Sequence, residues 1–147
     1  MTIGTVSNSN IVSQLWKNVY DIINTTITDP KSRSKWIYSS WPAEEKGTAD
    51  TFPRIIIDGA SIDSEQFVMG SKKLYKWTVP IYVYDTHMGT CDSLADSVVE
   101  KLNSNAGSFT TYGFFQPIVS ISSPTTVIIN GNIVHERRMD LDVEGDI

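Results

Sequence analysis

The chain has 147 residues, of which 40% are apolar and 20% charged, and its 17 acidic and 12 basic side chains give a formal charge of −5. This composition excludes a disordered chain, and the acidic balance argues against a nucleic-acid-binding surface, which usually needs a basic stripe. We therefore expect one globular domain over residues 1–147, with a flexible arm at residues 1–9.

Cys91 is the single cysteine of the chain, so no disulfide can form within it. This fits a reducing compartment such as the cytoplasm. The first residues show neither the basic start nor the apolar run of a signal peptide, and the apolar runs elsewhere are far too short to span a membrane. We expect a protein that works away from membranes.

The first half of the chain contains one helix and a long polar loop. Apolar residues recur at helical spacing over Asn10–Thr26, and Asp29-Pro30 ends this pattern. The aromatic segment Trp36–Trp41 suggests a short strand. Pro42–Thr51 is polar and is predicted to be a surface loop, long for a simple connection.

Three strands are predicted next. Phe52–Asp58 has three consecutive isoleucines and is expected to be buried on both faces, while Glu65–Met69 should form a hairpin with the long alternating stretch Lys73–Asp85. Pro80 has no N–H to donate, so it predicts a sheet edge or a backbone position without a partner. One face of the long strand is apolar and should be a core face, comprising Tyr75, Trp77, Val79, Ile81 and Val83.

The last third of the chain predicts a helix and three strands. The helix covers Asp92–Leu102 and should stop at Asn105–Gly107. A strand over Phe114–Ser122 follows, and then a hairpin centred on Asn130–Asn132. The order predicts an α+β fold with a mixed, mainly antiparallel sheet, two helices packed on one face, and a C-terminal β-hairpin.

One cluster of chemically useful residues lies between the long strand and the second helix. Asp85, His87, Cys91 and Asp92 are all of types that bind zinc, but their spacing matches no structural zinc pattern. The favoured interpretation is a polar loop in which Asp92 or Thr90 caps the helix. We predict no metal site here.

Cys91 could also act as a nucleophile with His87 or His135 as its base. Nothing in the sequence adds a third member or an oxyanion hole, and no glycine-rich phosphate loop is present. We therefore predict no catalytic residue and no cofactor, and we expect a protein that is not an enzyme.

The order of these elements resembles that of tail terminator (tail completion) proteins of long-tailed bacteriophages and related viruses. Four segments carry the resemblance, which covers most of the chain as a pattern: the helix Asn10–Thr26, FPRIIID at Phe52–Asp58, VPIYVYD at Val79–Asp85, and DSLADSVVEKL at Asp92–Leu102.

The resemblance implies a structural virion protein. Such a protein forms a hexameric ring that caps the tail tube, ends its polymerisation and joins the tail to the head connector. Its partners would be further copies of itself, the tail tube protein and the head–tail connector protein. It would lie in the virion tail or neck, and in the host cytoplasm before assembly. DNA would pass through the ring without specific binding.

Loops and strand edges give the candidate ring contacts. The basic pair Lys72-Lys73 could meet Glu44-Glu45 of a neighbouring copy. The alternatives are a head-completion or other neck protein of the same virion, a small cytoplasmic Cys-dependent enzyme, and a monomeric binding module. The residues expected at the subunit interface are Trp41, Glu44, Glu45, Lys72, Lys73 and Pro80.

Overall fold

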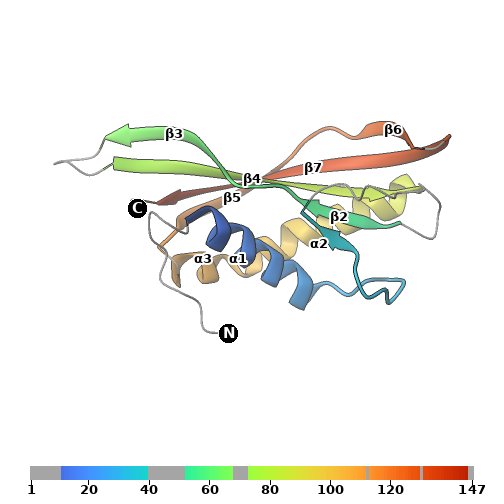
Figure 1. Ribbon diagram of the computed structural model, residues 1–147, viewed down its shortest axis with the longest axis horizontal. Helices are drawn as coiled ribbons and strands as arrows, with labels where there is room; N and C mark the ends of the chain where they lie inside the picture. The colour runs from blue at the N-terminus through green and yellow to red at the C-terminus, as the bar shows by residue number, and fades with distance from the viewer. Residues whose placement is uncertain (1–10, 40–51, 68–72, 112, 130, 146–147) are drawn as a thin grey trace.

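The computed structural model describes residues 11–39, 52–67, 73–111, 113–129 and 131–145, and these form one seven-stranded sheet with the helices on one face (Figure 1). The predicted α+β fold is confirmed, and a short third helix is added to it. The elements are α1 (Ile11–Thr26), β1 (Ile37–Tyr38), β2 (Arg54–Ile57), β3 (Ser61–Phe67), β4 (Lys73–Asp85), α2 (Met88–Ser104), α3 (Ala106–Thr111), β5 (Phe115–Ile121), β6 (Thr125–Ile129) and β7 (Asn132–Gly145).

The two longest strands, β4 and β7, form the centre of the sheet. They pair antiparallel from Tyr75 opposite Gly145 to Asp85 opposite His135. β2 and β3 follow one another along the free side of β4, and β5 and β6 do the same along β7. The sheet is therefore built on two long hairpins, β3–β4 and β6–β7, which are joined where β4 pairs with β7. β1 adds to the sheet parallel to β2.

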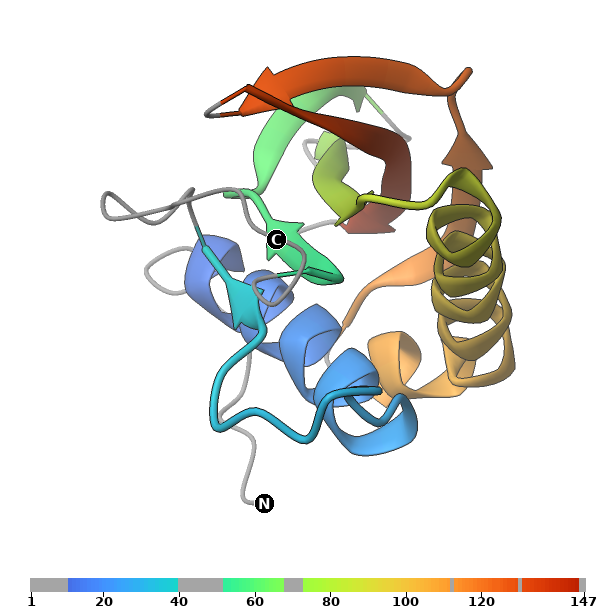
Figure 2. The ribbon, with the colours of Figure 1, turned by 90° about the vertical axis from the view of Figure 1, so that its right-hand side faces the viewer.

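The helix-covered face of the sheet holds the main core. The predicted core face of β4 is confirmed, because Trp77 is 6% exposed and Val79, Ile81 and Val83 are fully buried. Helices α1 and α2 lie against this face in both views (Figures 1 and 2). Their apolar stripes fill the space above it, chiefly through Leu15, Val19, Ile23, Ala95, Val98 and Leu102.

The opposite face of the sheet carries a smaller apolar cluster. Phe52, Ile56, Tyr84 and Val134 are buried together there, and none of the described helices covers them. Tyr82 stacks beside Tyr84 with ring centroids 6.2 Å apart. β2 is buried along its whole length, as its three isoleucines predicted, because it lies between these two clusters.

Pro80 lies in the central strand, so of its two expected positions the sheet edge was wrong, and the backbone position without a partner for the missing N–H was right. It pairs with Asp140 of β7 on one side, and its carbonyl oxygen accepts the N–H of Asp58 on the other at 2.9 Å. Because the N and O of a strand residue point the same way, the missing N–H faces the bend where β2 passes into β3. The ladder changes register there, between Ile57 opposite Ile81 and Ser61 opposite Thr78.

The start of α2 also differs from the prediction. The helix begins at Met88, and its N-cap is His87, whose side chain makes no capping hydrogen bond. Neither Asp92 nor Thr90 is therefore the cap, and the expected capping role was wrong. At the other end Asn105 is the C-cap, as predicted, but the chain continues directly into α3.

Candidate functional site

Cys91 is buried beneath β4 and β7 and is not poised as a nucleophile. Its side chain has no exposed surface, and its thiol lies 3.4 Å from the carbonyl oxygen of Val83 and 3.5 Å from that of His135. Burial, and then the negative charges of Asp92 and Asp85, raise the pKa of the thiol to about 11. A reactive cysteine needs the opposite, an accessible thiol with a lowered pKa.

The two histidines do not supply a base for Cys91. His87 is exposed before α2. His135 meets the thiol through its backbone carbonyl, and its own buried Nδ1 has no hydrogen-bond partner among the described residues. In the described part of the chain, no group of three or more His, Cys, Asp or Glu side chains could hold a metal ion. The residues that were considered for zinc thus lie in different environments: Asp85 and Cys91 are buried, and His87 is exposed.

Asp92 pairs with a strand residue. Its carboxylate accepts a hydrogen bond from Nε of Arg137 at 2.8 Å, and this bond holds the pKa of Asp92 below its usual value. Arg137 also donates to the carbonyl oxygen of Ser122 at 3.0 Å. These contacts tie the second turn of α2 to β7 and to the bend after β5. The role of Asp92 here is structural.

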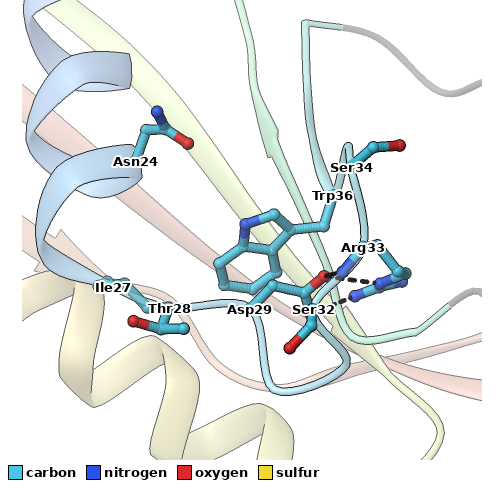
Figure 3. A pocket seen from close by; sticks show the side chains of 8 residues that line it. All are labelled: Asn24, Ile27, Thr28, Asp29, Ser32, Arg33, Ser34 and Trp36. Carbon is cyan, nitrogen blue, oxygen red and sulfur yellow. Dashed lines mark hydrogen bonds and ion pairs between the residues drawn. The ribbon is translucent and has the colours of Figure 1, made fainter.

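A polar pocket of about 360 Å³ lies beyond the end of α1 (Figure 3). At its base the Asp29 carboxylate accepts the backbone N–H groups of Lys31 and Arg33, at 3.0 and 2.8 Å, and the Arg33 guanidinium at 2.9 and 3.0 Å. Arg33 also donates to the carbonyl oxygen of Pro53. The buried Trp36 lines the same pocket.

Asp29 and Arg33 therefore form a clamp that holds the loop after α1 against the start of β2. Burial alone would raise the pKa of Asp29, but the hydrogen bonds from Arg33 and the loop backbone outweigh it, so the pKa is lowered. Sequence analysis used Asp29 only as the end of a helix. The signal that could have found the clamp was the pair Asp29-Pro30, which favours a turn in which the Asp side chain accepts backbone N–H groups just after it.

A second hollow of about 300 Å³ lies between the α1–β1 loop and the start of α2. Its lining is mostly apolar and also includes the buried Asp85, whose carboxylate accepts the N–H of Thr86 at 2.7 Å. The lining residues are Ile27, Thr28, Pro30, Pro53, Asp85, Thr90, Ser93, Leu94 and Ser97. The hydroxyl groups of Thr90 and Ser97 donate to the backbone carbonyl oxygens of His87 and Ser93, at 3.1 Å each.

Of the six residues predicted at the subunit interface, the described part of the chain includes Lys73 and Pro80. Trp41, Glu44, Glu45 and Lys72 lie outside the described residues. Lys73 is the first residue of β4 and pairs with Phe67 of β3. Pro80 lies in the centre of the sheet.

A surface that sequence analysis missed lies along β5, β6 and the start of β7. Ile118, Ile121, Ile128 and Ile133 are 60%, 47%, 74% and 60% exposed. Ile128 and Ile133 are opposite one another in the β6–β7 hairpin. The signal in the sequence was the lack of charge, because the whole stretch from Leu102 to His135 contains no Asp, Glu, Lys or Arg.

No family model matches this chain, and no curated protein matches its sequence. Among solved structures, it is similar to a chain of "Virion of native gene transfer agent (GTA) particle", with 9% identity and a TM-score of 0.44 over 92% of this chain and 96% of that chain. No helix of the described residues is long and apolar enough to cross a membrane.

Proposed function

We propose that this protein is a structural component of a tailed virus particle, and that it acts as a tail terminator. In this role a hexameric ring caps the tail tube, ends its polymerisation and joins the tail to the head connector. The resemblance carried by the helix, FPRIIID, VPIYVYD and DSLADSVVEKL segments motivates the proposal. The observation that carries it is the exposure of Ile121, Ile128 and Ile133, which the register places on one face of the sheet along the uncharged β5–β6 edge and which suit a contact surface.

The fold supports an assembly role because it separates a rigid body from protruding hairpins. The helices and the central strands form the body, while the β3–β4 and β6–β7 hairpins extend beyond it at opposite ends (Figure 1). Projections of this kind can reach a neighbouring copy on each side. The body in between supplies the stability that a ring subunit needs.

The candidate chemistry supports a non-catalytic role. Cys91 is fully buried, with a thiol pKa raised to about 11. Asp92 is held by Arg137, and Asp29 is held by Arg33. Of the groups considered for catalysis or metal binding, Cys91 is therefore inaccessible and Asp92 has a structural use.

The charged loops remain part of the proposal. Trp41, Glu44 and Glu45 would meet Lys72 and Lys73 of the next copy around the ring. Contacts of this kind set register and association rate more than affinity. They would add to an apolar contact and would not replace it.

The test is to assemble tails with and without the protein and to locate it by antibody labelling in the electron microscope. We expect label at the head-proximal end only, and tubes without a defined length when the protein is omitted. Adding back the purified protein should restore the length. Label along the whole tube, or unchanged length and unchanged head joining without the protein, would contradict the proposal. Label at the neck with unchanged tube length would instead indicate a head-completion protein.

A further inference from the structure

Two strands in the longest charge-free stretch of the chain, β5 and β6, form one continuous edge of the sheet. Charged residues are 20% of the sequence, yet none occurs from Leu102 to His135. β5 and β6 lie in this stretch and follow one another along the same side of β7. Between them the N–H of Ser122 donates to the carbonyl oxygen of Arg138 at 2.9 Å, so the pairing with β7 continues through the bend.

This edge has an unpaired outer side. Within the described residues, β5 and β6 pair only with β7, so the outward N–H and C=O groups are free to accept another strand. Natural edge strands are usually protected against such pairing by charged side chains. Here Pro117 removes one donor, but no charge protects the remainder, and three isoleucines of the two strands are exposed.

A second unpaired edge lies on the other side of the sheet, across β4 and β7 from β5. β3 pairs only with β4 among the described residues, and at seven residues it has the same length as β5. Its sequence, Ser61–Phe67, includes Asp63 and Glu65. Figure 1 shows β3 and β6 in hairpins that extend in opposite directions from the body.

We propose that the β5–β6 edge of one copy pairs with the β3 edge of the next copy, so that one sheet continues from subunit to subunit. This rests on the ring of the proposed function and names its contact. The occupant is a second copy for an electrostatic reason. Each copy carries −5, so two copies meet with least repulsion where one of them presents no charge.

The same reasoning sets the orientation of the contact. Pairing β3 with β3 would bring together two strands whose sequences both contain two acidic residues and no basic one. Pairing β5 with β5 would stop at two copies. A head-to-tail contact uses both edges in every copy, and it gives a ring when the rotation from one copy to the next closes.

Site-directed cross-linking of the full chain tests the contact. Ser61 of β3 and Ser120 of β5 are both exposed, and the native Cys91 is fully buried and does not compete for a short bis-maleimide. The Ser61→Cys/Ser120→Cys double variant should give a covalent ladder at multiples of 16.4 kDa, and either single variant alone should stay monomeric. Covalent dimers from Ser120→Cys alone, or monomer alone from the double variant, would overturn the proposal.

A charge placed on the edge should abolish the ladder. Ile118→Lys/Ile128→Lys in the double-cysteine background adds the missing protection, and Val12→Lys, on α1 and 45% exposed, is the matched control. We expect the first variant to lose all covalent species above monomer and the control to keep its full ladder. The melting temperatures of the two variants should be equal. A ladder that survives both lysines would refute the edge contact.

These outcomes are separate from those of the proposed function. A ladder without tail-end labelling would contradict the terminator and leave the edge contact intact. Tail-end labelling without a ladder would do the reverse.

Discussion

The helix-covered face of the sheet and the β5–β6 edge are built from the same kinds of residue but end in opposite environments. Val79, Ile81 and Val83 are fully buried under the helices, whereas Ile128 is 74% exposed. Both segments alternate or run apolar in the sequence. The difference teaches that an apolar pattern predicts a strand, while the covering layer depends on which elements fold over it.

The largest expected effect is on the covered face, at Trp77. Trp77→Ala removes a side chain that is 6% exposed and should lower the free energy of unfolding by about 3–5 kcal/mol. Its indole N–H has no hydrogen-bond partner among the described residues, so the loss is one of packing. Ile128→Ala is the contrasting variant and should change stability by less than about 0.5 kcal/mol in the isolated protein. Urea unfolding measures the free energy of unfolding of both variants. A loss under about 1 kcal/mol for Trp77→Ala would mean that Trp77 lies on an exposed face and that the core face of β4 is wrongly assigned.

The second prediction uses Cys91, also on the covered face. Its thiol pKa is raised from 9.0 to about 11, so the unfolded chain releases this proton first as the pH rises. Its contribution is therefore fully present below about pH 9 and is lost as the pH passes 11, at a cost of about 2–3 kcal/mol. The Cys91→Ala variant should lack this part of the decline. Parallel pH profiles for the two proteins would show that the thiol is not buried as described.

The third prediction concerns the clamp at the end of α1. Asp29→Asn removes a carboxylate that binds Arg33 and two backbone N–H groups, and should cost about 1–2 kcal/mol at neutral pH. Because the pKa of Asp29 is lowered, its contribution is present above the unfolded value of 3.8 and is lost as the pH falls below it. The difference between wild type and variant should thus shrink in acid. Asp96→Asn, exposed on α2, is the control, and an equal loss there would contradict the clamp.

Local patterns in the sequence were enough for most of the fold. The alternation in Lys73–Asp85, the helical spacing in Asn10–Thr26 and the Asn-Gly turn at Gly131 each gave the right element, because each is decided by a few neighbouring residues. Long-range pairing was not readable. Pro80 fits the centre of the sheet only because its missing N–H meets the bend after β2, and no local signal shows this.

The candidate site was harder to predict for the same reason. The sequence around Asp92 is typical of a helix cap. In the structure, however, Asp92 pairs with Arg137, a strand residue far along the chain. The charge-free stretch from Leu102 to His135 was visible in the sequence, but it becomes a surface only when β5 and β6 are known to form an edge. Topology, more than residue type, decides what these segments can contact.

The smallest expected effect comes from the charged loops, and it sharpens the contrast with the apolar edge. Reversing Lys72 and Lys73 to Glu should leave the unfolding free energy of the monomer within about 0.5 kcal/mol, because exposed charge pairs contribute little. The reversal should weaken the ring modestly, and only at low salt, where screening is weak. The charge-free β5–β6 contact should resist salt, so the Ile118→Lys/Ile128→Lys variant should lose the ring at every ionic strength. Light scattering at low and high salt compares the two variants directly. A ring that dissociates fully in high salt would place the main contact on the charged loops rather than on the edge.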